Sequence, residues 1–183
     1  DVRALGTLTN SLSIAFENAR LFRETEQRNA ELAVINSVQE GLVAEMDMQG
    51  IYDLVGDRVR DLFDAQAAMI VTFDHEKGIE IFQYHIEEGK RQYIPPRPID
   101  KIRHLLIKNK ELICINENLD EVWAQITGEP ATVIPGTKDT KSVLYVPMLV
   151  GDIVKGYVSL QNIDRENAFS DGDIQLLSTL VNS

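Results

Sequence analysis

Positive charge is concentrated in one short stretch of an acidic chain. Residues 90–110 carry a net charge of +6, whereas the whole sequence of 183 residues carries −11. Arg97 stands just before a predicted helix, and the N–H groups at a helix start attract anions, so Arg97 is a candidate contact for a phosphate or carboxylate. The alternative is a solvated face whose members pair with nearby acids. The charged residues of the stretch are Lys90, Arg91, Arg97, Asp100, Lys101, Arg103, Lys108 and Lys110.

The residue types that bind metals or act as nucleophiles are few and scattered. His75, His85 and His104 have no second His or Cys at metal-ligand spacing, so we expect surface or hydrogen-bonded histidines and no metal or haem ligand. Cys114 is the only cysteine and lies in an apolar run, which is typical of a small core residue and excludes an internal disulfide. No Ser/His/Asp set stands at a recognisable nucleophile turn, so we predict no catalytic residue.

The N-terminal quarter predicts one long helix, since residues 2–46 contain no proline and their apolar residues recur at helical spacing. Its front half has the alternating 3-4 spacing of a coiled-coil seam. The polar segment 23–29 interrupts this seam, and apolar spacing resumes at Leu32 in a shifted register. We expect a parallel homodimer through the front half; the alternative is a helix that packs along its own domain. The predicted seam is Leu5, Leu8, Leu12, Ala15, Ala19 and Phe22.

The remaining sequence predicts alternating helices and paired strands. A turn at 47–50 precedes a helix over 51–63, and a hairpin spans 67–84. Residues 95–98 interrupt regular structure, and Pro98 suits the first turn of a helix over 99–109. A strand at 112–115, a helix over 117–127 with Trp123, a hairpin over 142–161 and a final helix capped by Ser170 complete the order. The predicted class is α+β: an antiparallel sheet with helices from both chain ends on one face, preceded by a long N-terminal coiled-coil helix.

The first eleven residues nearly repeat the last eleven, at an offset of 172 residues. Self-similarity at a spacing of one domain indicates a tandem array. We therefore predict that residues 1–24 end a preceding domain and act as a linker helix, and that residues 25–183 form the domain itself.

The second predicted hairpin and the segment after it resemble the GAF domain family. The matching residues are SVLYVPMLVGDIVKGYVSLQN at 142–162 and AFSDGD at 168–173, which correspond to the family's last two strands, the asparagine after them and the Phe-x-x-x-Asp before its closing helix. Residues 10–22 look like the helix that joins tandem GAF units in bacterial sensor histidine kinases and adenylate cyclases. The resemblance covers about residues 25–183 and implies a sensory or regulatory domain.

The resemblance also bears on known ligands of the family. Asn162, Phe169 and Asp173 match the signature of cyclic-nucleotide-binding members, but Ile163 and Ile174 replace its lysine and glutamate. We expect the matching residues to serve structure: the asparagine in a turn, the phenylalanine in the core and the aspartate at a helix start. Bilin-binding members attach the chromophore to a cysteine, often beside a histidine, and related methionine sulfoxide reductases use several cysteines. This chain has neither context, so neither bilin nor haem is expected.

The resemblance implies that the sheet face away from the terminal helices lines the ligand pocket. Tyr157, Ser159 and Gln161 share one face of the last predicted strand, and Trp123 crosses nearby, so these four residues and Arg97 are the candidate ligand contacts. The ligand would be a small molecule, with an anion as one candidate. The alternative is a half-exposed sheet face that binds nothing.

Composition and charge exclude several partners. A net charge of −11 disfavours nucleic acid and acidic membranes, which both require clustered Lys and Arg. No apolar run is long enough for a membrane span, and we expect a cytoplasmic protein. The predicted function is a non-catalytic sensory GAF domain that binds a small ligand and relays its state through a dimeric helix. The alternatives are a dimerisation spacer without a ligand and, less favoured, a cyclic-nucleotide-binding domain.

Overall fold

The structure is a computed structural model that describes residues 20–30, 32–33, 48–63, 65–131 and 133–182. Residues 20–30 are helical, and after them come four further helices and seven strands in the described part of the chain. In chain order these are α2 (Met48–Phe63), β1 (Ala67–Asp74), β2 (Ile79–Glu87), β3 (Lys90–Arg91), β4 (Arg97–Pro98), α3 (Lys101–Asn109), β5 (Ile113–Ile115), α4 (Leu119–Thr127), β6 (Ser142–Val150), β7 (Ile153–Asn162) and α5 (Asp171–Val181).

The strands form one antiparallel sheet in the order β3-β2-β1-β7-β6-β5, and β4 pairs with β2 beside this path. Two long hairpins, β1–β2 and β6–β7, make up most of the sheet, and they meet where β1 pairs with β7. Both hairpins and the α+β class were predicted from the alternating apolar pattern and the turn residues between the strands, and the structure confirms them.

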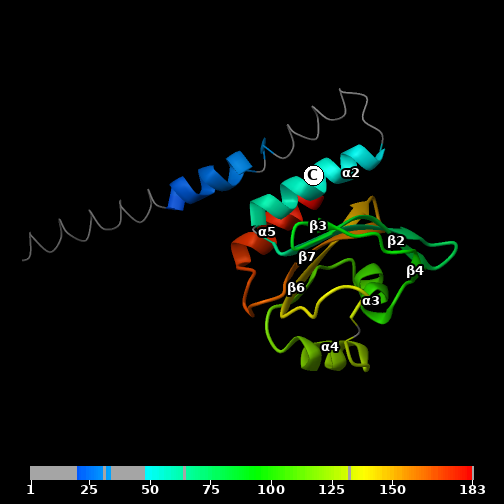
Figure 1. Cartoon of the computed structure of the whole chain (residues 1–183). Helices are drawn as coiled ribbons and strands as arrows, with labels where there is room; N and C mark the ends of the chain where they lie inside the picture. Colours follow the sequence, from blue (N-terminus) through cyan, green and yellow to red (C-terminus); the bar gives the residue numbers. More distant parts are fainter. Residues whose placement is uncertain (1–19, 31, 34–47, 64, 132, 183) are drawn as a thin grey trace, which may run out of the picture.

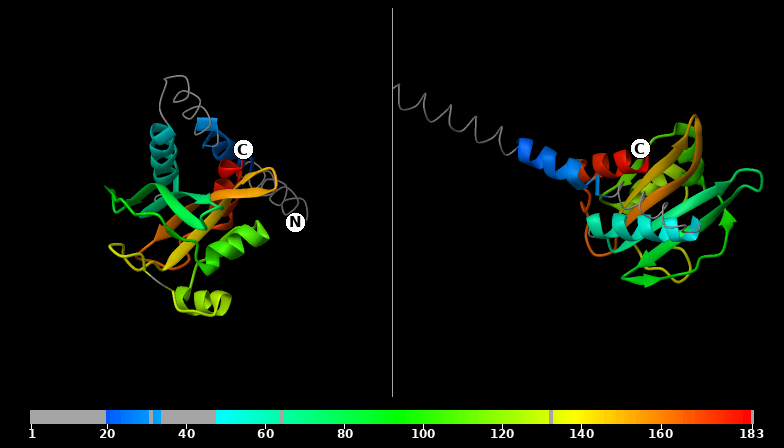
Figure 2. Two further views of the ribbon diagram at one scale, coloured as in Figure 1. Left: turned by 90° about the vertical axis from the view of Figure 1, so that its right-hand side faces the viewer. Right: turned by 90° about the horizontal axis from the view of Figure 1, so that it is seen from above.

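Helices cover both faces of the sheet, as Figures 1 and 2 show. Helices α2 and α5 pack on one face, where α2 contacts β1 and β2 and α5 contacts β6. Helices α3 and α4 cover the other face. The two faces hold separate apolar clusters, one around Ile70, Leu160 and Leu177 and the other around Val71, Leu106 and Trp123. Because β1 lies between two covered faces, its residues form a nearly continuous buried apolar run.

A β-bulge in β2 sets which of its side chains face α3 and α4. Ile70 pairs with Tyr84 but Val71 pairs with Phe82, so Gln83 is the extra residue. The carbonyl of Gln83 accepts a hydrogen bond from the side chain of Gln49 in α2 (2.9 Å). The extra residue places Tyr84 in the cluster under α2 and α5, and Phe82 against the opposite cluster.

Three predicted helix starts can be compared with the structure. Helix α5 begins after Ser170, which forms a capping box with Asp173, as the sequence predicted for the cap. Helix α2 begins at Met48, so the turn predicted over 47–50 is wrong from residue 48 onward. Pro98 is not in the first turn of α3, because it pairs with Ile79 in the short edge strand β4, where its missing N–H costs no ladder bond.

The predicted dimer seam lies mostly outside the described residues. This holds for Leu5, Leu8, Leu12, Ala15 and Ala19. Phe22 lies in the helical segment 20–30 and is 65% exposed. Among the described helices, none combines the length and the apolar character that a membrane span requires.

Candidate ligand-binding site

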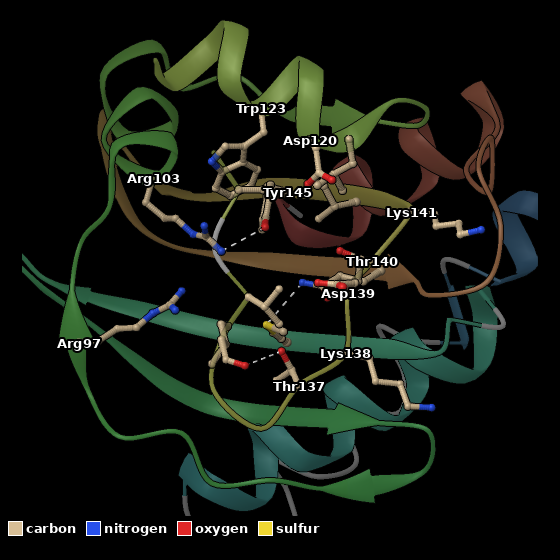
Figure 3. Close-up of a pocket in the computed structure, with 17 residues that line it drawn as sticks. Arg97, Arg103, Asp120, Trp123, Thr137, Lys138, Asp139, Thr140, Lys141 and Tyr145 are labelled. Atoms are coloured by element: carbon tan, nitrogen blue, oxygen red, sulfur yellow. Dashed lines mark hydrogen bonds between the residues drawn. The ribbon is translucent and has the colours of Figure 1, made fainter. Parts of the chain in front are cut away.

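A cavity of about 300 Å³ lies between the sheet and the segment that contains α4, Ala131 and residues 133–141. Figure 3 shows α4 and the following loop at the cavity, with Trp123 extending from the helix, Arg103 next to it and Arg97 lower on the left of the view. Its lining residues are Met69, Arg97, Arg103, Leu119, Asp120, Trp123, Ala131, Val133, Ile134, Thr137, Lys138, Asp139, Thr140, Lys141, Val143, Tyr145 and Gln161. A broader hollow at the start of α4 adjoins the cavity, since the two share Leu119, Asp120, Thr140 and Lys141.

A buried ionic network lies behind one wall of this cavity, and its members Arg97, Arg103 and Tyr145 line the cavity itself. Glu80 in β2 is 0% exposed, and its carboxylate accepts hydrogen bonds from Arg97 Nε (2.5 Å) and from the Tyr157 hydroxyl (2.9 Å). Arg103 lies beside it, with Nε 3.7 Å from the Glu80 carboxylate. Arg103 also donates to Asp100 (2.7 Å) and to the Tyr145 hydroxyl (3.1 Å). Buried charges are tolerated when they are paired and hydrogen-bonded, and each member of this network has such partners.

Aromatic rings enclose the Arg103 guanidinium. Its central carbon lies 4.6 Å from the ring centre of Tyr145, 5.5 Å from that of Tyr157 and 5.7 Å from that of Trp123. Burial alone would lower the pKa of Arg103, but the two phenols and the carboxylates of Asp100 and Glu80 raise it well above its ordinary value. For Tyr157, whose neutral form is the protonated one, burial raises the pKa. Its hydroxyl therefore keeps the proton that it donates to Glu80.

The five predicted ligand contacts fall into two groups. Arg97, Trp123 and Gln161 line the cavity, although they come from three different elements. Tyr157 and Ser159 share the cavity-facing side of β7 with Gln161, but both are fully buried and do not line the cavity. Tyr157 instead holds Glu80 and contacts Arg103. The prediction of the shared face therefore holds, while Tyr157 and Ser159 lie beneath the cavity wall.

The helix start next to Arg97 is not an open anion site. The side chain of Asp100 caps α3 by accepting from the backbone N–H of Arg103 (3.0 Å), so a protein carboxylate already occupies this position. Several other cations of the stretch 90–110 pair with acids on neighbouring elements, as the alternative interpretation expected. Examples are Arg91 with Asp53 and Lys110 with Asp152.

His85 differs from its prediction. It was expected at the surface or hydrogen-bonded, but it is 2% exposed and neither ring nitrogen has a hydrogen-bond partner among the described residues. The hydroxyl of Ser159 is also buried without a described partner. His85 and Ser159 both pair with Met69, from opposite sides of β1, and therefore lie on one row of the cavity-facing sheet surface. In this row a polar residue stands on each side of Met69, one from β2 and one from β7.

The residues that match the cyclic-nucleotide signature have structural roles. The side-chain oxygen of Asn162 accepts from the backbone N–H groups of Asp164 (3.1 Å) and Arg165 (2.9 Å) and so holds a turn. Phe169 is buried in the cluster under α5, and Asp173 completes the cap of that helix. These roles agree with the structural interpretation of the signature.

Neither the environment of Cys114 nor the described acidic and histidine residues indicate a thiolate or a metal centre. Cys114 packs against the cluster under α2 and α5, and burial raises the pKa of its thiol, which disfavours the thiolate. Within the part of the chain that the structure describes, no group of three or more His, Cys, Asp or Glu side chains could hold a metal ion.

Sequence reasoning missed several residues of the cavity wall. Glu80 and Arg103 were not assigned a role, because each stands in an amphipathic element whose charged residues are usually exposed. Met69 and Tyr145 were taken simply as parts of strands. A usable signal for Arg103 was its position directly after Ile102 and three residues before Leu106, which are both buried on the inner side of α3.

The substitution Glu80→Gln tests the buried network. It leaves Arg97 and Arg103 without their shared buried counter-charge, and we expect it to lower the free energy of unfolding by about 3 kcal/mol. Glu88→Gln is the matched control, because Glu88 forms an exposed ion pair with Lys138 whose loss costs about 1 kcal/mol or less. Urea denaturation at pH 7 measures both changes. Equal losses in the two variants would contradict the network's role.

The pH dependence of stability tests the environment of His85. Burial, assisted by the charge of Arg91, lowers the pKa of His85 to about 4, whereas an unfolded histidine titrates near 6.5. The unfolded chain therefore binds the extra proton first as the pH falls. The stability that neutral His85 provides is present above about pH 6.5 and is lost towards pH 4, which amounts to about 2 kcal/mol between pH 7 and pH 5.

Urea denaturation of His85→Leu at pH 7 and pH 5 measures this contribution. We expect the variant to lose less stability than the wild type between the two values. His104→Leu, at an exposed position on α3, is the control and should keep the wild-type difference. A His85→Leu variant with the full wild-type pH dependence would show that His85 titrates normally.

Comparison with solved structures supports the fold. A GAF domain from an Acinetobacter phosphoenolpyruvate-protein phosphotransferase is 14% identical, with a TM-score of 0.68 over 85% of this chain and 88% of that chain. The phycoerythrobilin-bound GAF domain of a cyanobacterial phytochrome is 14% identical, with a TM-score of 0.64 over 84% of this chain and 92% of that one. A type II free methionine-R-sulfoxide reductase from Thermoplasma acidophilum is 15% identical, with a TM-score of 0.55 over 74% and 91% of the two chains.

At these identities the likeness shows the shared fold alone. A comparison with curated protein sequences gives no match. The family model of the GAF domain matches residues 47–183, which include every described element from α2 to α5. The start of the domain that we predicted at residue 25 stays a prediction, because the family match begins later. Since the match covers most of the sequence, the chain belongs to the GAF domain family.

Proposed function

We propose that this chain is a sensory GAF domain that binds a small molecule in the cavity between β7, α4 and residues 133–141. The observation that supports this most directly is the cavity itself. Its lining mixes apolar side chains with polar and charged groups from separate elements, and such groups can orient a ligand. Arg97 from β4, Trp123 from α4 and Gln161 from β7 converge there although they are far apart in the sequence.

A regulatory role without catalysis fits the chemistry of the cavity wall. The strongest ionic groups beside the cavity, Glu80 and Arg103, each form hydrogen bonds with fixed partners. Groups held in this way are better suited to supporting a rigid cavity wall than to transferring protons. The raised pKa of Cys114 disfavours thiolate chemistry. Cyclic nucleotide binding is not favoured, because the residues that match its signature are engaged in a turn, the core and a helix cap.

The second part of the proposal concerns the parent protein. We propose that the domain is one unit of a tandem array in a cytoplasmic, multidomain bacterial sensor histidine kinase or cyclase, and that a parallel dimeric helix at residues 1–24 relays its state. The near-repeat of the first and last eleven residues supports this arrangement. The exposed Leu21 and Phe22 of the helical segment give it an apolar surface that a second copy of the helix would cover.

Trp123 makes the cavity testable, because it is the only tryptophan of the chain and lies in the cavity wall. We expect at least one member of a library of small acids, amides and amines to change its fluorescence in a saturable way. Ala131→Phe places a ring in the cavity lining and should weaken that binding by about tenfold or more. Ala124→Phe, on the exposed side of α4, is the control and should bind normally.

The outcome separates a sensor from a spacer. A cavity that binds no member of the library, or an Ala131→Phe variant that binds as well as the wild type, would contradict ligand sensing there and favour a dimerisation spacer. Ligand-detected NMR provides a second readout that does not depend on Trp123.

The dimeric helix can be tested at the polar interruption of its seam. Glu26 and Asn29 continue the seam register beyond Phe22, so the double variant Glu26→Leu/Asn29→Leu should tighten the dimer, with a lower dissociation constant in sedimentation equilibrium. Glu24→Leu/Gln27→Leu has the same spacing and the same change of charge but lies off the seam. It should leave the dissociation constant unchanged. A monomer in all three proteins would refute the dimeric helix.

A further inference from the structure

One of the two arginines that line the cavity has two guanidinium nitrogens that donate no hydrogen bond to a described residue. Each of the three guanidinium nitrogens of Arg103 already donates to a protein oxygen, on Tyr157, Asp100 or Tyr145, and three aromatic rings lie around the guanidinium. Arg97 donates through Nε to Glu80, and no hydrogen bond joins its two terminal nitrogens to another described residue. Figure 3 shows this end of Arg97 directed towards the middle of the cavity.

The protein fixes Arg97 in this orientation. Arg97 and Glu80 are direct cross-strand partners in β4 and β2, so their ion pair follows from the strand register. The guanidinium also stands over the ring of Phe82, with 5.2 Å between its central carbon and the ring centre. The side chain is 26% exposed, which leaves its terminal edge accessible. A held guanidinium with two parallel N–H groups matches the two oxygens of a carboxylate.

The remaining charges of the site favour an anion with a single charge. The ammonium of Lys138 pairs with Glu88, and Figure 3 shows Lys138 and Lys141 directed away from the two arginines. Asp120 and Asp139 also line the cavity, and Glu80 and Asp100 already balance the arginines. A phosphate dianion would bring more negative charge than the terminal edge of Arg97 can offset, whereas a carboxylate brings one charge to one guanidinium.

The part of the cavity around Trp123 suits a small, flat, apolar ring. Trp123 and Tyr145 provide aromatic surface, and Met69 and Val143 form an apolar floor. The amide of Gln161 lines the same floor, and its nitrogen has a described contact only with the sulfur of Met69 (3.9 Å). It can therefore bond to one polar atom of a ligand. A volume of about 300 Å³ is at the lower end of the range for ligand pockets.

We infer that the cavity takes a small monocarboxylate with a planar ring. The carboxylate binds the terminal edge of Arg97, and the ring lies against Trp123 above the floor that contains Gln161. This inference rests on the proposed ligand-sensing function and narrows it to one chemical class. It assigns Arg97 as the residue that selects charge, and Arg103 as a structural neighbour without a direct bond to the ligand.

Benzoate and benzamide test the inference, since the two have nearly the same shape and differ in charge. Titration of each against Trp123 fluorescence, with ligand-detected NMR as a second readout, should show benzoate binding about tenfold or more tightly. Inorganic phosphate should neither bind comparably nor displace benzoate. Arg97→Gln should weaken benzoate by about tenfold or more and leave benzamide unchanged.

Two further variants distinguish a loss of benzoate binding from a loss of folded structure. Arg97→Lys keeps the charge beside Glu80 but removes the two-pronged donor, so it should fold normally and still weaken benzoate. Arg91→Gln removes an arginine that pairs with Asp53 outside the cavity and should bind both probes as the wild type does. Thermal unfolding of each variant establishes that it is folded.

Each result has a defined meaning. Equal binding of benzoate and benzamide, wild-type benzoate binding by Arg97→Gln, or strong competition by phosphate would overturn the inference. If neutral probes bind and benzoate does not, the inference falls while the proposed sensing function stands. If no probe of either charge binds and the wider library also fails, both fall together.

Discussion

The structure of the cavity depends on one electrostatic constraint: charges that are removed from water must find fixed partners. Glu80 is fully buried, and it draws Arg97, Arg103 and Tyr157 around its carboxylate. These contacts tie β2 to β4, to α3 and to β7. Each of these elements thereby gains a fixed position relative to the sheet. The protein itself therefore fixes the side chains at this wall, and the ligand binding that we propose would require little further ordering of them.

The same network explains why α4 can close the cavity with few direct contacts to the sheet. Trp123 reaches from α4 to the Arg103 guanidinium and to the apolar cluster around Val71 and Leu106. The buried cation thus gives the aromatic ring a partner on the inner side of the helix. A hydrophobic contact alone would position the indole less specifically, because dispersion has no preferred direction. A cation–π interaction, in contrast, is strongest when the cation stands over the face of the ring.

Local patterns in the sequence predicted the long hairpins and most helices, but not the start of α2, the short strand β4 or the site. The β6–β7 hairpin was predictable because apolar residues run on both sides of Gly151 and Asp152, and the cap of α5 because Ser170 precedes Asp173 at the right spacing. Glu80 lies in β2 and Arg103 in α3, with two short strands and a loop between them in the sequence. The spacing of residues within a single helix or strand cannot predict a contact over this separation. His85 was mispredicted for a similar reason, since its burial results from the strands and loops packed around it.

The residues that identify the family carry little information about a ligand. Asn162, Phe169 and Asp173 hold a turn, fill the core and cap a helix, so a chain needs them to adopt the fold whatever it binds. Arg97 and Trp123, in contrast, lie in the short strand β4 and in α4, between the two long hairpins of the sheet. Family membership therefore establishes the scaffold, and the function has to be argued from the side chains that line the cavity.

The extra residue in β2 has a consequence for how this chain can change. Gln83 is the extra residue between Phe82 and Tyr84, so its removal would leave these two residues on opposite faces and still paired with Val71 and Ile70. Removal of Ile81 would instead shift Glu80 by one position and turn its carboxylate towards α2, away from its arginines, because side chains alternate between the two faces of a strand. The strand is therefore tolerant of a change in length at the bulge and intolerant of one between the bulge and Glu80. Insertions and deletions are better tolerated in the long segment between α4 and β6, where no strand register has to be kept.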